Sequence, residues 1–139
     1  MKIDKFRDEH FFLSNFYIHP IIINGREYKS SEHYFQACKM LRAEDHDLVS
    51  NQELPGLARK LAHLLPMRDD WDQVKDNIMR QALKEKFADP ELKSKLLSTA
   101  PAELIEGNWW HDTYWGIDQK TGEGKNMLGH LLMELRDTL

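Results

Sequence analysis

A carboxylate and an amine stand seven residues apart where the chain has the features of a helix start. Glu32 and Lys39 share one helical face with the two residues at intermediate spacing, Phe35 and Gln36. The two charged groups would lie about two turns, roughly 10 Å, apart along the axis, so their long side chains could converge on one small substrate. The same spacing also fits a solvent-facing acid and lysine on an ordinary amphipathic helix.

The residues before Glu32 favour a helix that begins at this point. Either Ser30 or Ser31 can act as the N-cap, because a serine hydroxyl accepts a hydrogen bond from a first-turn amide that has no partner within the helix. The positive end of the helix then favours the Glu32 carboxylate. Upstream, Ile21–Ile23, the pair Asn24-Gly25 and the following Glu27-Tyr28 predict a β-hairpin with a type I′ turn.

An aromatic and polar segment, residues 106–116, is the second place where residue types suggest binding. It contains Trp109, Trp110, Tyr114 and Trp115 together with Asp112. Aromatic planes can stack on a flat base, and each such contact contributes about 1 to 3 kcal/mol in single-strand recognition. The segment is therefore interpreted as a pocket wall, with aromatic packing beneath a loop as the alternative.

Two positions could hold a phosphate. Residues 122–126 precede a helix, where glycine allows close backbone approach and exposed amides with Lys125 and Asn126 could bind an anion. Arg59 is a second candidate for a phosphate contact. The alternatives are an ordinary helix-entry turn for the first and a solvated helix face for the second.

Helices are predicted for most of the remaining chain. Pro55 and Gly56 are expected to break the chain before a helical stretch over 57–62, and apolar spacing predicts a long helix from Trp71 to Phe87. A further helix fits 90–99, with Leu92, Leu96 and Leu97 as its apolar face, and a last one fits 126–139. Trp71 is expected to belong to the core or to wall a pocket. The predicted fold class is mainly α (α+β), with several helices and a short N-terminal β-hairpin.

Composition limits the class of protein. A chain of 139 residues with 41% hydrophobic content predicts one compact domain over 1–139, and a net charge of -4 argues against a general nucleic-acid coat. The only cysteine, Cys38, cannot form an intrachain disulfide and is interpreted as a structural thiol. Seven scattered histidines without His-Glu-x-x-His or paired cysteines predict no metal site. Without a long apolar segment or a secretory signal, the sequence predicts a cytoplasmic protein that meets no membrane.

Several blocks of sequence carry a family resemblance. They are Phe-Phe-Leu-Ser-Asn-Phe at 11–16, Ser-Glu-His-Tyr-Phe-Gln-Ala at 31–37 with Lys39, Trp71 to Phe87, Asp-Thr-Tyr-Trp-Gly at 112–116, Gly-Lys-Asn-Met-Leu-Gly at 124–129 and Leu-Leu-Met-Glu-Leu-Arg at 131–136. In this order the blocks resemble the NADAR family, also called YbiA-like proteins. The resemblance implies the family's compact, mainly helical fold. It also implies a hydrolase of N-glycosyl bonds that needs no cofactor.

The resemblance implies a substrate class and a set of site residues. Family members cleave ribosylated intermediates of riboflavin synthesis, which here would release ribose 5-phosphate, or ADP-ribose attached to guanine in nucleotide or nucleic acid. A non-catalytic ADP-ribose or NAD-binding module is the alternative outside enzymes. The expected catalytic residues are Glu32, Lys39 and Asp112, and the expected substrate-binding residues are Asn15, Phe16, Arg59, Trp71, Trp115, Lys125 and Asn126. The sequence identifies no protein partner.

Cleavage of a ribosyl C–N bond requires an acid for the leaving nitrogen and negative charge near the sugar. Glu32 would protonate the leaving amine or activate water while Asp112 stabilises the sugar cation, and the assignment of the two roles stays open. A second route uses a neutral Lys39 amine that forms a Schiff base with the sugar, which water then hydrolyses. Burial of Lys39 would favour this route, and an ionised Glu32 nearby would oppose it.

Overall fold

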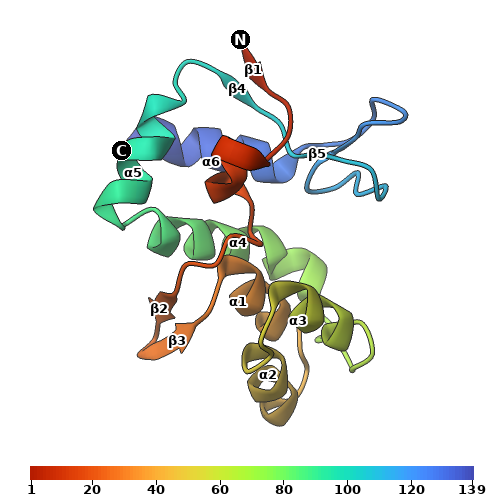
Figure 1. Ribbon diagram of the computed structural model, residues 1–139. Helices are drawn as coiled ribbons and strands as arrows, with labels where there is room; N and C mark the ends of the chain where they lie inside the picture. Colours follow the sequence, from red (N-terminus) through yellow and green to blue (C-terminus); the bar gives the residue numbers. More distant parts are fainter. The chain divides into compact units, whose positions relative to one another are not determined.

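The computed structural model describes residues 1–139, and their contacts divide the chain into two units. The helical unit is Asn15–Lys86, and the terminal unit combines Met1–Ser14 with Phe87–Leu139. Helices account for most of the regular structure and all strands are short, which confirms the predicted mainly α fold class (Figure 1). No helix is both long and apolar enough to cross a membrane. A single domain over 1–139 stays a prediction.

The helical unit begins with the predicted hairpin. Strand β2 (Ile21–Ile23) pairs antiparallel with β3 (Arg26–Tyr28). Between them, Asn24 and Gly25 have φ angles of 53° and 78°. A type I′ turn requires positive φ at both central residues, and this is the reason that the Asn-Gly pair predicts the turn correctly.

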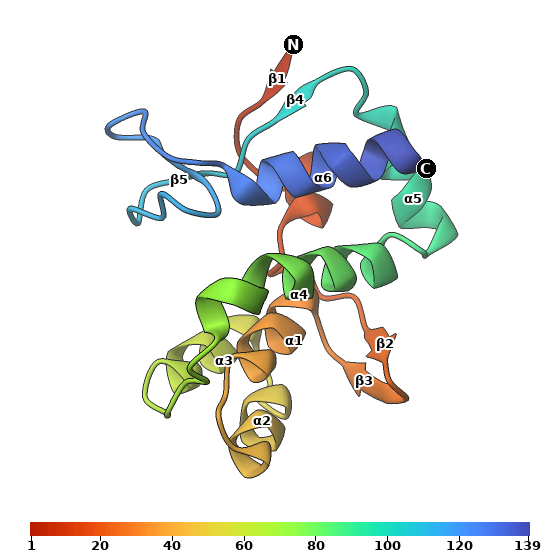
Figure 2. The same ribbon diagram turned by 180° about the vertical axis from the view of Figure 1, so that it is seen from behind.

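Helix α1 (Ser31–Cys38) is buried along nearly its whole length. Ser30 is the N-cap, and its Oγ accepts a 3.1 Å hydrogen bond from the amide of His33, which decides between the two serine candidates. Residues 31–37 are all buried, because α2 (Ala43–Ser50), α3 (Pro55–Ala62) and α4 (Trp71–Lys86) pack against this helix (Figure 2). The alternative of a solvent-facing acid on an amphipathic surface helix is therefore wrong for Glu32.

The other helices of this unit agree with the sequence in part. Helix α4 has the predicted start at Trp71 and ends before Asp89-Pro90. Helix α3 starts at Pro55 itself, two residues earlier than predicted, because proline fits the first helical position, where no amide donor is needed. Helix α2 was not predicted, since its sequence Ala-Glu-Asp-His-Asp-Leu-Val-Ser has little apolar periodicity.

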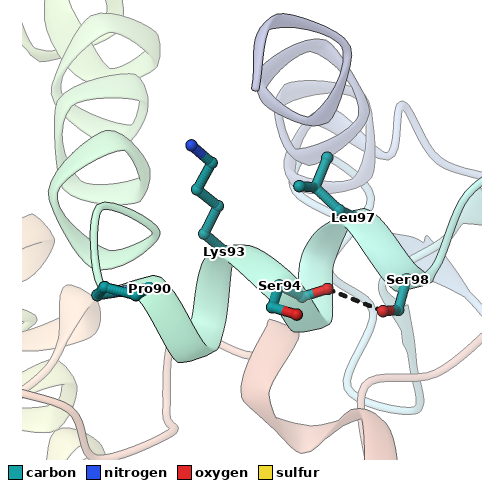
Figure 3. A pocket seen from close by; sticks show the side chains of 5 residues that line it. All are labelled: Pro90, Lys93, Ser94, Leu97 and Ser98. Atoms are coloured by element: carbon teal, nitrogen blue, oxygen red, sulfur yellow. Dashed lines mark hydrogen bonds between the residues drawn. The ribbon is translucent and has the colours of Figure 1, made fainter.

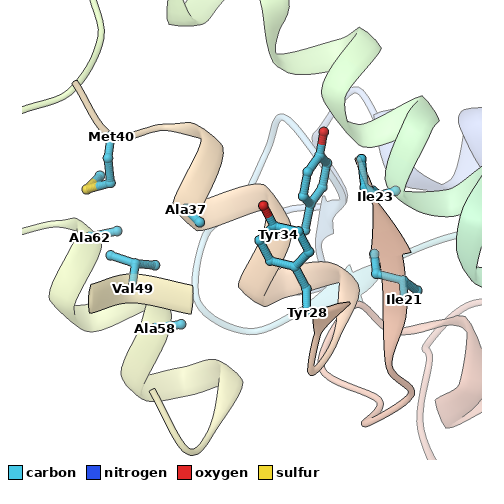
Figure 4. Packing of buried hydrophobic residues seen from close by; sticks show 10 residues of the cluster. Ile21, Ile23, Tyr28, Tyr34, Ala37, Met40, Val49, Ala58 and Ala62 are labelled. Atoms are coloured by element: carbon cyan, nitrogen blue, oxygen red, sulfur yellow. The ribbon is translucent and has the colours of Figure 1, made fainter. Parts of the chain in front are cut away.

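Small side chains bring α1 and α3 close together. Ala37 of α1 and Ala58 and Ala62 of α3 are buried in one cluster, with Val49 of α2 beside them (Figure 4). On the hairpin side of α1, the cluster continues through the rings of Tyr28 and Tyr34, whose centroids lie 4.9 Å apart in an edge-on contact. Because alanine side chains are small, the backbones of α1 and α3 can approach closely. Side chains next to these alanines are therefore brought close to the neighbouring helix.

The terminal unit contains the remaining predicted helices and two strand pairs. Helix α5 (Pro90–Ser98) is capped by Asp89, whose carboxylate accepts from the amide of Leu92 at 3.1 Å. Helix α6 (Met127–Thr138) buries Leu128, Leu131 and Leu132. On α5 Leu96 is fully buried, but Leu97 is 39% exposed, so the assignment of Leu97 to the same apolar face is wrong.

Short elements complete this unit. Strand β1 (Lys2–Ile3) pairs parallel with β4 (Glu103–Leu104). A 3-10 helix, η1 (Asp8–Leu13), follows β1 in the chain. Strand β5 (Gly107–Asn108) pairs parallel with β6 (Ile117–Asp118). Two-residue strands lack a periodic pattern, and for this reason the sequence does not predict them.

Candidate active site in the helical unit

Glu32 is held at the first turn of α1 by contacts with Asn15. The Glu32 amide donates to the Asn15 carbonyl at 3.2 Å, and the Ser31 hydroxyl donates to Asn15 Oδ1 at 2.8 Å. The Glu32 side chain is only 6% exposed, and its Oε2 accepts a 2.8 Å hydrogen bond from Gln36 Nε2 one turn later. A buried carboxylate in a fixed orientation is a suitable group for proton transfer. Asn15 thus positions Glu32 from the side of the helix start.

The His33 ring also holds the first turn of α1, through hydrogen bonds to Ser30 and to residue Gln52 outside the helix. Its Nδ1 pairs with Ser30 Oγ at 2.7 Å, and its Nε2 donates to the Gln52 carbonyl at 2.9 Å. Because Nε2 faces a carbonyl, Nδ1 of the neutral ring accepts from the serine hydroxyl. Burial lowers the pKa of His33, and the nearby Lys29 adds to this effect. His33 is thus buried and hydrogen-bonded beside Glu32.

Lys39 ends α1 and is half-buried beside charged neighbours. Burial lowers the pKa of its amine, and the Glu32 carboxylate acts in the opposite direction. Two cations on other helices, Arg59 and Lys75, lower this pKa further. The structure therefore brings Glu32 and Lys39 into electrostatic contact, and it favours the neutral amine more than solvent would.

Aromatic side chains flank this face of α1. The rings of Phe35 and Trp71 lie with centroids 5.0 Å apart and tilted by 59°. Trp71 is buried, so its core role agrees with the sequence, and it connects α4 to the face that carries Glu32. Phe16 is half-buried and lies beside Gly56 of α3. A Cβ atom at position 56 would be 3.8 Å from the Phe16 ring.

Lys75 is the residue of this region that the sequence did not identify. It lies one turn after Trp71 on α4, as Lys39 lies one turn after Phe35 on α1. No pattern in the sequence indicates that Lys75 acts on the pKa of Lys39, because this depends on how α4 packs against α1. Gln36 appeared in the sequence only as part of the helical face, whereas the structure makes it the partner of Glu32.

Cys38 is half-buried and lies next to Tyr34. Burial raises the pKa of its thiol, and the hydrogen bond with Tyr34 and the charge of Arg68 counteract only part of this effect. A thiol with a raised pKa is a poor nucleophile at neutral pH. This supports the structural interpretation of Cys38.

Asp112, Trp115 and the helix-entry turn in the terminal unit

Asp112 organises the aromatic segment of the terminal unit. Its Oδ1 accepts from the amides of Tyr114 at 3.1 Å and Trp115 at 2.9 Å, and its own amide donates to Asn108 Oδ1 at 2.9 Å. Such an Asx turn holds both the carboxylate and the following ring in a set orientation. The rings of Tyr114 and Trp115 are in edge-on contact at 4.9 Å. The catalytic role of Asp112 and the substrate contact of Trp115 stay predictions.

The amides at the start of α6 donate hydrogen bonds within the terminal unit. The amides of residues 125–128 donate to the carbonyls of Thr113, Gly116, Tyr114 and Trp115 at 2.8 to 3.2 Å. The aromatic segment already occupies the amides of Lys125 and Asn126, and the anion-binding interpretation of residues 122–126 as a whole stays a prediction. The Lys125 amine lies over the Tyr114 ring, 5.4 Å from its centroid, and its side chain is exposed.

Asn126 has a structural position in the same turn. It adopts a left-handed conformation with φ 52°, and its side chain is buried. Its Oδ1 accepts from the Glu106 amide and its Nδ2 donates to the Leu104 carbonyl, both at 2.9 Å. Both ends of the amide are thus used within the unit. Substrate contacts by Lys125 and Asn126 stay predictions.

A shallow hollow on the surface of α5 contains none of the predicted residues. Pro90, Lys93, Leu97 and two serines line it, and the Ser98 hydroxyl donates to the Ser94 carbonyl at 2.9 Å (Figure 3). Lys93 is the only ionisable side chain of this lining. The hollow therefore lacks the acid and base that hydrolysis requires.

Comparisons with known proteins cover almost the whole chain. The model of the NADAR domain family matches residues 3–139. The N-glycosidase YbiA of Escherichia coli is 42% identical over 135 residues, which is 95% of this chain and 83% of that protein. The NMR structure of E. coli YbiA matches with a TM-score of 0.88 and 39% identity, covering 99% of this chain and 83% of the other.

Parts of longer proteins are also similar. A riboflavin biosynthesis protein of Vibrio vulnificus is 36% identical over 95% of this chain but only 36% of its own length. The chloroplastic riboflavin biosynthesis protein PYRR of Zea mays is 37% identical over 78% of this chain and 19% of its own.

Proposed function

Because this chain belongs to the NADAR domain family, we propose that it is an N-glycosidase of phosphoribosylamino-pyrimidine intermediates of riboflavin biosynthesis. It hydrolyses the ribosyl C–N bond and releases ribose 5-phosphate. The similarity to an N-glycosidase and to proteins named for riboflavin biosynthesis supports this substrate class. The observation that carries the proposal is the buried Glu32 carboxylate on the same helical face as a Lys39 amine with a lowered pKa.

Glu32 serves as the proton-transfer group. The leaving nitrogen must gain a proton as the C–N bond breaks, and the attacking water must lose one. A carboxylate held by Gln36 and shielded from solvent can do either without a change of its own position. Asp112 remains the predicted stabiliser of the positive charge on the sugar.

Lys39 supports a covalent route to the same products. The ribosylamine opens to an imine at C1, and the neutral Lys39 amine adds to that carbon. The bond from C1 to the base nitrogen then breaks, the base leaves as an amine with a proton, and a Lys39 Schiff base remains. Water adds to C1 and releases the sugar aldehyde and the free lysine. Borohydride during turnover would reduce the Schiff base, so a labelled Lys39 peptide is expected, and no adduct would remove the covalent route.

The test of the activity compares two substrates and two matched variants. The purified protein is incubated with a ribosylamino-pyrimidine phosphate and, separately, with ADP-ribosyl-guanosine, and release of ribose 5-phosphate or ADP-ribose is followed. Glu32→Gln is expected to lower kcat by about 10²- to 10⁴-fold, the usual contribution of a general acid or base. Glu27→Gln, an exposed carboxylate on β3, is the control. Release from the second substrate alone would assign the protein to reversal of guanine ADP-ribosylation instead.

A further inference from the structure

Two cationic side chains from other helices, Arg59 and Lys75, act on the charge of the Lys39 amine at the end of α1. Lys39 ends α1, Arg59 lies in the middle of α3, and Lys75 lies in the second turn of α4. Both α3 and α4 pack against α1. The Glu32 carboxylate also acts on the Lys39 amine, so three cations here face one carboxylate of the protein and keep positive charge for an anionic ligand.

Arg59 is brought to this place by the alanine contact between α1 and α3. It follows buried Ala58, which packs in the same cluster as Ala37 of α1, two residues before Lys39 (Figure 4). The Arg59 side chain is half-buried, and its guanidinium takes part in no ion pair or hydrogen bond of the structure. A partly buried guanidinium with five donors and no acceptor is costly unless a ligand supplies one.

Lys75 reaches the same place from the opposite helix. The Phe35–Trp71 ring contact joins α1 to α4, and the charge of Lys75 on α4 acts on the Lys39 amine. The Lys75 side chain is only 19% exposed, whereas Asp72, its ion-pair partner at 3.1 Å, is 83% exposed. An ion pair with so exposed a carboxylate contributes little, and a phosphate would offer Lys75 more negative charge than Asp72 does.

We propose that Arg59 and Lys75 bind the phosphate on C5′ of the ribosyl substrate, next to the Lys39 amine. This inference rests on the proposed function for the identity of the sugar. A phosphate monoester is largely dianionic at neutral pH and matches two adjacent cations, and an arginine fork bonds two of its oxygens. The proposed site lies apart in the sequence from the turn at 122–126, where the amides of Lys125 and Asn126 are already bonded to carbonyls.

Phosphate binding here also assigns a task to Lys75, which no sequence pattern indicated. The phosphate would hold the sugar at the α3 and α4 side of α1, with C1 directed along the helical face toward Lys39 and Glu32. Arg59 and Lys75 are then specificity residues that distinguish a ribose 5-phosphate from an unphosphorylated ribose. In ADP-ribose the phosphate attached to C5′ is part of a diphosphate, and it could bind to the same two cations. The experiment therefore includes ribose 5-phosphate and ADP-ribose.

The first measurement compares kcat/KM for the ribosylamino-pyrimidine with and without its 5′-phosphate. The wild type is expected to prefer the phosphorylated substrate, and Arg59→Gln or Lys75→Met should each reduce that preference by about 10- to 100-fold, the usual effect of losing one hydrogen bond to a charged group. Lys60→Met, an exposed cation adjacent to Arg59 on α3, is the matched control and should keep the preference. If Arg59 acted only through the pKa of Lys39, both substrates would slow equally, and the proposal would be overturned. Loss of the preference in Lys125→Met alone would also overturn it.

The second measurement does not depend on turnover. Ribose 5-phosphate, ADP-ribose and ribose are titrated separately into ¹⁵N-labelled protein, and amide shifts are followed. We expect shifts on α3 and α4 with a phosphorylated sugar and none with ribose, and Arg59→Gln should weaken binding by about 10- to 100-fold. Binding without turnover of any substrate would support the phosphate site and reject the N-glycosidase proposal. No shifts on these helices with either phosphorylated ligand would reject the phosphate site whatever the activity. Binding of ADP-ribose alone would restrict the site to the diphosphate.

Discussion

The Ser30 hydroxyl has two tasks at the start of α1, and removing it should have an effect larger than that of an ordinary helix cap. Ser30 Oγ accepts from the His33 amide at 3.1 Å and donates to His33 Nδ1 at 2.7 Å, and both residues are fully buried. Loss of a serine cap costs about 1 kcal/mol. A buried ring nitrogen without its partner costs about 1 to 3 kcal/mol more. Ser30→Ala should therefore lower the free energy of unfolding by about 2 to 4 kcal/mol.

Urea denaturation of Ser30→Ala, followed by circular dichroism, measures this loss. For a chain of this length the midpoint of thermal unfolding should fall by about 3 to 5 °C per kcal/mol. The matched control is Ser98→Ala on α5, whose exposed hydroxyl donates to a carbonyl of its own helix, and its effect should stay within about 0.5 kcal/mol.

A double-mutant cycle separates the two tasks of Ser30. In His33→Ala the backbone amide of residue 33 still donates to Ser30, so the cap remains, while the ring's contacts with Ser30 and with the Gln52 carbonyl are lost. Ser30→Ala and His33→Ala should therefore show a coupling energy of about 1 to 3 kcal/mol. A coupling energy near zero, or a loss in Ser30→Ala no greater than in Ser98→Ala, would refute the reasoning. Because Glu32 lies within the same turn, Ser30→Ala should also lower kcat.

Three further outcomes follow from the same contacts. Asn126→Ala should lower the free energy of unfolding by about 2 to 5 kcal/mol, since it leaves a buried carbonyl and a backbone amide without their partner, and equal urea midpoints would contradict this. Burial lowers the pKa values of His33 and His46 in the folded state, so below about pH 6.5 the unfolded chain binds more protons and stability should fall between pH 7 and pH 5. His46→Gln should make that decline shallower, and an unchanged slope would exclude its contribution. Glu32→Gln removes the charge that raises the pKa of Lys39, so a ¹³C NMR titration of the Lys39 Cε should report a lower pKa, and a higher one would contradict the electrostatic contact.

Local rules of sequence were sufficient for several elements of this fold. The Asn24-Gly25 pair predicted the hairpin turn, and the apolar spacing after Trp71 predicted α4. Each of these depends on residues that are neighbours in sequence. Helix α2 and the two-residue strands depend on packing against distant segments, and their sequences contain no periodic signal.

For the site residues too, the sequence predicts what depends on near neighbours in the chain and not what depends on packing between distant segments. The placement of Glu32 and Lys39 on one face followed from helical spacing, and the structure adds that the face is buried and that Gln36 holds the carboxylate. The turn before α6 has the glycines and the lysine of an anion site, but the amides of Lys125 and Asn126 are bonded to carbonyls of the 113–116 segment. No local pattern could reveal that use, since it depends on a loop packed against the helix start.

The sequence by itself determined the helix that carries Glu32 and Lys39, the hairpin that leads to it and the family to which the chain belongs. These follow from caps, turns and spacing, which act over a few residues, and from blocks of residues in a set order. Only the tertiary structure decided that Arg59 and Lys75 approach Lys39, because they come from helices that meet α1 through alanine and aromatic contacts. Burial and the mutual effect of charges depend on which segments pack together, and this is decided by the whole chain.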